Sequence, residues 1–165
     1  HQTLHIDSLN FYPSKNNEDN ATNIALICAQ LNEKIDCTAQ YFNTYYHIHD
    51  EMDPTIFIHK DGIPIGLLNL NIINNPSSDT LCACINYIYI LHAHRRQGYS
   101  NQIAKYILHA MQISHYATPR KIWATEMEIV TQEGQYFCNN ITKVLEYQRP
   151  NGTKWREYID HFDTL

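Results

Sequence analysis

The order of segments along the chain predicts an α/β (α+β) fold, with a mixed, mainly antiparallel sheet of six to seven strands and helices on both faces. Three observations support this prediction: a β-hairpin signal at Asp61-Gly62, a strand that turns through a glycine into a helix over 86–111, and two apolar helical stripes before residue 50. A length of 165 residues with 44% hydrophobic content suits one core. A single domain over 1–165 is therefore expected.

The first part of the chain is predicted to contain one strand and two helices. Loose alternation of apolar and polar residues over 4–11 predicts the strand, and a polar run at 14–20 follows it. Apolar residues at helical spacing then predict a helix pair over about 22–33 and 37–48.

A β-hairpin and the segments after it complete the predicted fold. Asp61-Gly62 favours a tight hairpin turn, and apolar, β-branched segments flank it at 55–60 and 63–73. After a polar loop, the later segments are a strand over 81–91, a helix with an apolar stripe from Ile103 to Met111, a strand over 121–125, a helix over 132–145, and a second hairpin with strands at 146–149 and 154–162 around Asn151-Gly152.

The segment 95–100 joins the strand over 81–91 to the helix after it, and it contains Gly98. A strand that turns through a glycine into a helix leaves the first N–H groups of that helix without acceptors, at the positive end of the helix dipole. With Arg95 and Arg96 beside it, this turn is a candidate site for a phosphate or pyrophosphate group. An ordinary strand-to-helix turn with two solvated arginines is the alternative.

The sequence Ile-Tyr-Ile-Leu-His-Ala-His-Arg-Arg-Gln-Gly-Tyr-Ser, over 88–100, resembles motif A of the GNAT-type N-acetyltransferase superfamily. In that motif a hydrophobic strand leads into Arg/Gln-x-x-Gly-x-Gly/Ala, which opens a helix. Arg95, Gly98 and Ser100 take its three marked places. The chain departs from the motif at Ser100, where Gly or Ala is usual, and at His92, where proline often follows the strand. The order of predicted elements is also similar to the whole GNAT fold.

The resemblance implies an acyltransferase that moves an acetyl group from acetyl-CoA to a primary amine, by direct attack of the amine on the thioester. Backbone groups of three strand residues would meet the pantetheine amides: Ile88, Tyr89 and Ile90. The turn would hold the pyrophosphate, mainly through its backbone: Arg95, Arg96, Gln97, Gly98, Tyr99, Ser100 and Asn101. In the family, the strand before the turn and the strand after its helix splay apart to receive the pantetheine arm.

Candidate acid and base groups lie further along the chain. The strand over 81–91 carries no Asp or Glu, so the base that some family members place there is missing. Glu126 and Glu128 would share one face if the following strand continues that far, and either could be the base; solvated strand-end carboxylates are the alternative. The family's acid is usually a tyrosine on the helix before the last hairpin, but Asn140 takes that place in this chain. Tyr136, one turn earlier on the same helical face, is therefore the candidate acid, with Asn140 as a cofactor contact. A core tyrosine, with water as the acid, is the alternative.

Charge and composition favour a cationic amine or peptide amine as the substrate. The formal net charge is -5, which argues against a nucleic-acid partner. In the family, the amine pocket lies against the first helix pair, where this chain has aromatic and acidic residues: Tyr41, Tyr45, Asp50 and Glu51. An acidic helix end that only solubilises the next loop is the alternative.

The cysteines and the hydropathy indicate the compartment. Five scattered cysteines form neither a disulfide framework nor a zinc pattern, which predicts reduced thiols in a cytoplasmic protein. Cys82-Ala-Cys84 would lie on one face of a strand, so a metal pair is an alternative there, although no partner pair follows. The sequence has no run of about 18 apolar residues, so no contact with a membrane is expected. The sequence leaves a homodimer open.

Two other functions compete with the enzyme. His47-Ile-His49 and His92-Ala-His94 are His-x-His pairs, which on a strand would put two imidazoles on one side, as a metal site requires. The first pair is expected to end a helix and no spaced carboxylate completes a pattern, so no metal is expected. A non-catalytic acyl-CoA-binding sensor would keep the fold and the cofactor and lack turnover.

Overall fold

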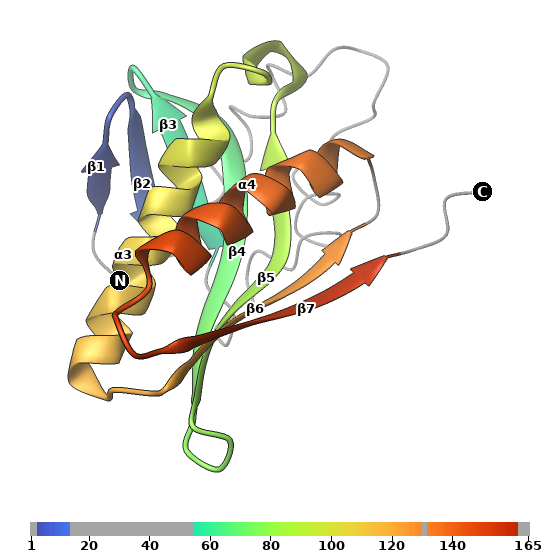
Figure 1. Ribbon diagram of the computed structural model, residues 1–165. Helices are drawn as coiled ribbons and strands as arrows, with labels where there is room; N and C mark the ends of the chain where they lie inside the picture. Colours follow the sequence, from blue (N-terminus) through green and yellow to red (C-terminus); the bar gives the residue numbers. More distant parts are fainter. Residues whose placement is uncertain (1–2, 14–54, 130–131, 162–165) are drawn as a thin grey trace. The chain divides into compact units, whose positions relative to one another are not determined.

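The computed structural model describes residues 3–13, 55–129 and 132–161. These ranges contain seven strands, a 3-10 helix and two long helices (Figure 1). In chain order they are β1 (Leu4–Ile6), β2 (Leu9–Pro13), β3 (Thr55–Lys60), β4 (Ile63–Asn75), β5 (Thr80–Ile90), η1 (His92–His94), α3 (Tyr99–Ala117), β6 (Ile122–Ile129), α4 (Gln132–Gln148) and β7 (Lys154–His161). The strand order in the sheet is β1-β2-β3-β4-β5-β6-β7, with antiparallel and parallel pairs, so the predicted α/β fold with a mixed sheet is confirmed.

The chain divides into two compact units. Unit 1 takes in residues 1–70 and 87–97, and unit 2 takes in residues 71–86 and 98–165. In unit 1, strands β1 to β4 pair antiparallel. Asp61 and Gly62, with φ of 51° and 78°, form the predicted turn between β3 and β4. The core side chains of this unit include Leu9, Phe11, Ile56, Ile58, Ile65 and Leu67, all fully buried.

The single strand predicted over 4–11 is wrong, because two strands occupy this stretch. Asp7 has a φ of 52° and forms a tight turn with Ser8, after which Leu9 pairs with Ile6. Aspartate enters the left-handed region more readily than most residues because its short side chain can bond to the local backbone. The turn consists of two residues, so the alternation of apolar and polar residues continues almost unbroken from β1 into β2.

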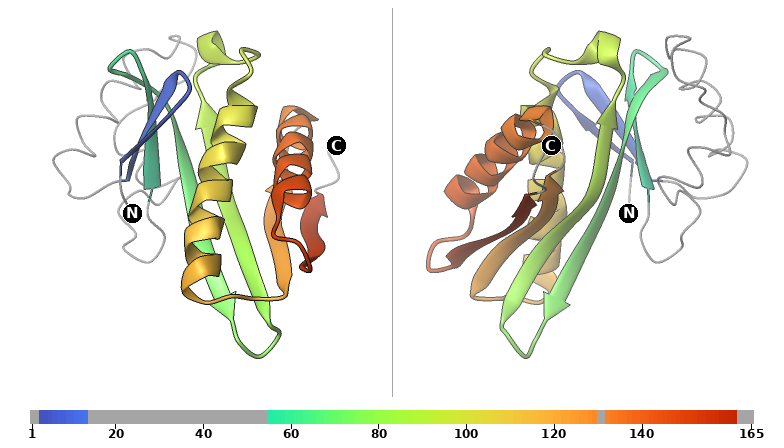
Figure 2. Two further views of the ribbon diagram at one scale, coloured as in Figure 1. Left: turned by 60° about the vertical axis from the view of Figure 1, so that its left-hand side comes forward. Right: turned by 90° about the vertical axis from the view of Figure 1, so that its right-hand side faces the viewer.

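In unit 2, strands β5, β6 and β7 run parallel to one another. The β5–β6 register runs from Thr80↔Ile122 to Ile85↔Met127, and β7 pairs with β6 over the whole of β6. Each parallel pair is joined by a helix, α3 or α4, and both helices lie on the same face of β6 and β7 (Figure 2). Trp123 of β6 is fully buried, and its Nε1 donates a hydrogen bond of 3.2 Å to Nδ1 of His115 on α3.

The predicted second hairpin is wrong in its first strand. Residues 146–148 are the last turn of α4, and β7 alone follows the turn at Asn151-Gly152. The apolar stripe of α4 continues through Ile141 and Leu145, both fully buried, and this burial keeps the segment helical. Pro150 cannot continue the helix, and Gly152, with a φ of 88°, turns the chain into β7.

The predicted helix pair over about 22–33 and 37–48 lies outside the described residues, as does the polar run at 14–20. Within the described ranges, β3 has the predicted bounds, and β4, β5, β6 and α4 are each displaced or extended by a few residues. The extension of β6 to Ile129 matters most, because it takes Glu126 and Glu128 into the strand. None of the helices in the described part of the chain is long and apolar enough to span a membrane.

Candidate active site

The turn at Gly98 has the conformation that the sequence predicts. Gly98 is the N-cap of α3 with φ 76° and ψ 14°, in the left-handed region that favours glycine. No side chain caps the helix, and the first turn contains no acidic residue. A Cβ added at Gly98 would meet no atom within 4 Å, so the space beside this turn is open. An uncapped helix N-terminus facing open space is suited to an anion.

Asn140 of α4 contacts this turn. Its Nδ2 donates a hydrogen bond of 3.2 Å to Oγ of Ser100, in the first turn of α3. The two residues were predicted separately as cofactor contacts, and the structure brings them together. Tyr136 lies one turn earlier on α4, with 65% of its surface exposed. It is therefore not a core tyrosine.

The strand end and 3-10 helix that precede the turn belong to unit 1. Arg95 reaches back to the end of β5, where its Nε donates a hydrogen bond of 2.7 Å to the Ile90 carbonyl and its Cζ lies 5.5 Å from the centroid of the Tyr89 ring. Arg96 has a φ of 62° and is exposed, and Gln97 Nε2 donates to the Ala93 carbonyl over 3.3 Å. Arg95 thus stabilises the link, whereas Arg96 faces solvent.

Gly66 of β4 is a residue that sequence reasoning missed. A Cβ at this position would lie 2.3 Å from the Tyr89 carbonyl oxygen and 2.6 Å from Cδ1 of Ile90, both on β5. Next to it, the Leu91 N–H donates to the Ile65 carbonyl over 2.8 Å. The backbone of β4 therefore approaches β5 too closely for any side chain at position 66. This approach occurs at the residues predicted to bind pantetheine.

The two candidate bases lie on one face of β6, as the sequence predicts for a strand that continues past residue 125. Glu126 and Glu128 are exposed, and they alternate with Thr125 and Met127, which are buried. Because Trp123 shares the face of the buried pair and contacts α3, the carboxylates lie on the opposite face of the strand. The two carboxylates differ in one respect, which is that Glu126 contacts a thiol on the neighbouring strand β5.

Two thiols on β5 contact Glu126. Cys84 pairs in register with Glu126, and its Sγ donates to Oε2 of Glu126 over 3.5 Å. The same sulfur lies 3.8 Å from Sγ of Cys82. The hydrogen bond from Cys84 lowers the pKa of Cys82, whereas that bond and burial raise the pKa of Cys84 well above its usual range. Cys82 is therefore the first of the pair to ionise.

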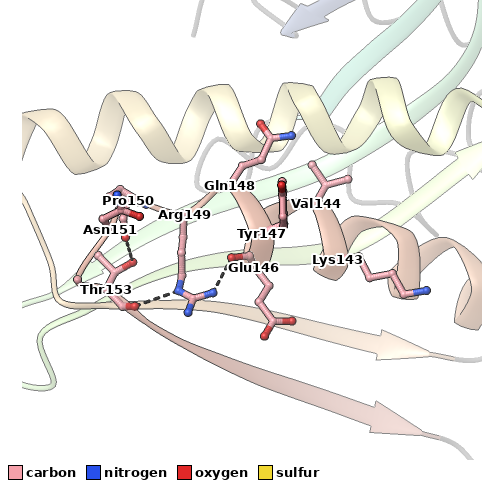
Figure 3. A pocket seen from close by; sticks show the side chains of 10 residues that line it. Lys143, Val144, Glu146, Tyr147, Gln148, Arg149, Pro150, Asn151 and Thr153 are labelled. Carbon is pink, nitrogen blue, oxygen red and sulfur yellow. Dashed lines mark hydrogen bonds between the residues drawn. The ribbon is translucent and has the colours of Figure 1, made fainter.

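A hollow of about 700 Å³ lies beside the C-terminal end of α4 (Figure 3). Figure 3 shows Arg149 bridging the helix end and the following loop, since its guanidinium donates to the carbonyls of Glu146 and Thr153. All the residues that line it come from the stretch 143–153, and Leu145 is the one residue of this stretch that does not. None of the predicted site residues lines this hollow, so it does not define the candidate active site.

Several predicted site residues lie outside the described residues: Tyr41, Tyr45, Asp50 and Glu51. The pair His47 and His49 lies there too. The second histidine pair, His92 and His94, forms the 3-10 helix η1 and not a strand. Residues two apart on a 3-10 helix point in different directions, so this pair does not have the strand geometry that the metal-binding alternative requires.

A profile of the acetyltransferase (GNAT) family matches residues 20–128, well over half of the chain. The chain belongs to this family. Membership confirms the resemblance predicted from the motif at 88–100, and it confirms the enzyme class, an acyltransferase that transfers acetyl groups. No curated protein sequence matches the chain.

Solved structures with similar folds are distant in sequence. Ribosomal-protein-alanine N-acetyltransferase from Brucella melitensis biovar Abortus 2308 is 17% identical to this chain and has a TM-score of 0.48. The match covers 94% of this chain and 100% of that protein, and the coverages below are given in the same order. Aminoglycoside N-acetyltransferase AAC(6')-Iy in complex with CoA is 12% identical, with coverages of 99% and 97% and a TM-score of 0.48. A mutant of the AtaT toxin, bound to the C-terminus of the antitoxin AtaR and acetyl-CoA, is 9% identical, with coverages of 82% and 83% and a TM-score of 0.54. This last likeness supports the fold.

Proposed function

We propose that this GNAT-family chain is an N-acetyltransferase that moves the acetyl group of acetyl-CoA to a primary amine. The observation that supports this most is the start of α3, where Gly98 takes a left-handed conformation, no side chain caps the helix, and the adjacent space is open. Such a turn offers backbone N–H groups and the positive end of a helix dipole to a pyrophosphate. We take the domain to span 1–165.

In this proposal the cofactor contacts extend in both directions from Gly98. The pyrophosphate would lie against the turn, whose members are Arg95, Arg96, Gln97, Gly98, Tyr99, Ser100 and Asn101. The pantetheine amides would meet backbone groups of Ile88, Tyr89 and Ile90. The hydrogen bond from Asn140 to Ser100 supports a cofactor contact from α4, since it holds an amide side chain beside the turn.

The chemistry needs a base for the incoming ammonium and an acid for the departing thiolate. Glu126 and Glu128 are the candidate bases, and both are exposed on β6. Tyr136 is the candidate acid, because it is exposed one turn from the residue that contacts Ser100. Water could also protonate the thiolate, since a thiol with a pKa near 8.5 is an undemanding leaving group.

The acceptor in this proposal is a cationic small-molecule or peptide amine. The net charge of -5 supports a cationic substrate, and the substrate contacts would include Tyr41, Tyr45, Asp50 and Glu51. Nucleic acid is not the proposed partner. Five cysteines without a disulfide pattern support a reducing, cytoplasmic setting.

A CoA-release assay tests the proposal. Purified protein is incubated with acetyl-CoA and a panel of polyamines, aminoglycosides and N-terminal peptides, and free thiol is followed over time, with mass spectrometry of the acetylated amine. We expect at least one amine to be acetylated with one CoA released per acetyl group. Binding of acetyl-CoA by calorimetry without turnover on any amine would favour the sensor over the enzyme. No binding at all would overturn both.

A further inference from the structure

Three side chains that can bind a metal ion lie together on one face of the β5–β6 pair. Cys82 and Cys84 are two residues apart on β5, so their side chains point to the same side of the sheet. Glu126 pairs in register with Cys84 from the neighbouring parallel strand. The two sulfurs and a carboxylate oxygen all lie within 4.8 Å of one another. Among the described residues, these are the side chains that form such a group.

Two of the three distances between ligand atoms match those of a tetrahedral site. Two thiolates bound to one zinc ion at about 2.3 Å lie about 3.8 Å apart, and a thiolate and a carboxylate oxygen lie about 3.6 Å apart. The observed distances are 3.8 Å between the sulfurs of Cys82 and Cys84 and 3.5 Å from Cys84 Sγ to Glu126 Oε2. The third pair of ligand atoms, on Cys82 and Glu126, lies within 4.8 Å, so small rotations of the side chains are enough for all three to reach one ion.

We propose that Cys82, Cys84 and Glu126 bind one thiolate-preferring divalent cation, such as Zn²⁺ or Cd²⁺. The two sulfurs supply soft ligands and Glu126 supplies one oxygen, a mixture that suits a borderline or soft ion and disfavours Mg²⁺ and Ca²⁺. Both thiols lose their protons to the solvent on binding, because the thiolate is the ligand. Glu126 is exposed, so water completes the fourth position.

The parallel register explains why the sequence pattern shows only two of the three ligands of this site. Cys82-Ala-Cys84 predicts two ligands on one face, but zinc patterns usually provide a second pair close in sequence. Here the third ligand lies 42 residues from Cys84, on the strand after α3. The site is built by the β5–α3–β6 crossover, so it forms only when these two strands pair. Glu126 is also a candidate base, and a bound ion would occupy its carboxylate, so the tests below measure metal binding and not turnover.

Titration with Cd²⁺ tests the proposal on the full chain. Reduced protein in metal-free buffer is titrated while the thiolate-to-metal charge-transfer absorption is followed, a band that imidazole ligands do not produce. We expect saturation at one ion per chain. Cys82→Ser combined with Cys84→Ser should abolish the band and weaken binding at least about 100-fold, since even indirect disturbance of metal ligands costs 10–100-fold. Glu126→Gln should keep the band and weaken binding about 10-fold.

Cys138→Ala is the matched control, because Cys138 is a buried free thiol on α4. This variant should keep the band and the affinity of the unaltered chain. A full-strength band in the double cysteine variant would overturn the proposal, because the thiolates would then come from elsewhere in the chain.

A second measurement needs no substitution, so it tests the site even if the double cysteine variant fails to fold. The native protein is alkylated with and without saturating Zn²⁺, and each cysteine peptide is quantified by mass spectrometry. Zn²⁺ should slow alkylation of Cys82 and Cys84 together by at least tenfold and leave Cys138 unchanged. Equal alkylation rates at Cys82 and Cys84 with and without the ion would overturn the site.

Discussion

The start of α3 and the face of β6 that carries Glu126 and Glu128 are two parts of the candidate active site, and they are built from different atoms. At the start of α3 the important groups are backbone N–H groups and the left-handed conformation of Gly98. On β6 they are the carboxylates of Glu126 and Glu128, with the Cys84 thiol against Glu126. The comparison shows where side-chain identity should matter. A backbone site tolerates most side-chain changes and fails when its backbone is blocked, whereas a carboxylate fails when one oxygen becomes an amide.

The largest expected effect is at Gly98, where Gly98→Glu should abolish measurable binding of acetyl-CoA. A side chain there would extend into the open space beside the turn and place a carboxylate where the pyrophosphate is proposed to lie. The left-handed conformation costs a non-glycine residue about 1–2 kcal/mol, so the fold should survive. Calorimetry measures the affinity, and thermal melting measures the stability.

Gly152→Glu is the matched control for Gly98→Glu. Gly152 also has a positive φ, of 88°, and a Cβ there also meets no atom within 4 Å. It lies in the turn before β7, away from the proposed cofactor contacts. It should lower stability by a similar amount and leave acetyl-CoA affinity unchanged. If both variants bind acetyl-CoA like the unaltered chain, the turn at Gly98 is not the pyrophosphate site.

The contrast between the two regions also explains what the sequence could predict. Gly98 and Asp61-Gly62 have conformations that their own residue types favour, so short stretches of sequence predicted both turns correctly. The Asn151-Gly152 signal also marked a real turn. It gave no information on the segment before it, and the burial of Ile141 and Leu145 makes that segment a helix.

Contacts between distant strands could not be predicted in the same way. Cys84 and Glu126 are 42 residues apart, and only the β5–β6 register brings them together. The close approach of the Tyr89 carbonyl to Gly66 is also a contact between two strands, and the residues next to Gly66 in the sequence do not indicate it. The Asn140–Ser100 hydrogen bond likewise depends on the packing of α4 against α3. The sequence identified both of these residues as candidates, and their proximity required the fold.

The next largest effect is expected on β6, where Glu126→Gln should lower kcat/KM by roughly 10²–10⁴-fold if Glu126 is the base. Glutamine keeps the size of the side chain and cannot accept the proton from the ammonium. The deficit should shrink as the pH rises, because more of the amine is then already neutral. Glu128→Gln is the matched control on the same face of the same strand. A large loss in Glu128→Gln and a small one in Glu126→Gln would assign the base to Glu128.

The smallest effect is expected for Tyr136→Phe, which should lower kcat by roughly 10–10³-fold and leave acetyl-CoA affinity near that of the unaltered chain. The interaction that is lost exists only as charge develops on the sulfur, so it affects turnover and not binding. Tyr136 is 65% exposed, so water can take over as the acid, which places the loss near the lower end of that range. The phenylalanine keeps the ring, so the packing of α4 is retained.

Two further variants on α4 decide whether Tyr136 or Asn140 is the functional group on this helix. Tyr147→Phe removes the hydroxyl of another exposed tyrosine, 89% exposed, and should leave both kinetic constants unchanged. Asn140→Ala breaks the hydrogen bond to Ser100 and should raise the KM for acetyl-CoA with little change in kcat. Steady-state kinetics with one accepted amine separate these outcomes. An unchanged kcat in Tyr136→Phe would remove tyrosine as the acid and leave water in that role, with α4 contributing only through the contact that Asn140 makes with the cofactor turn.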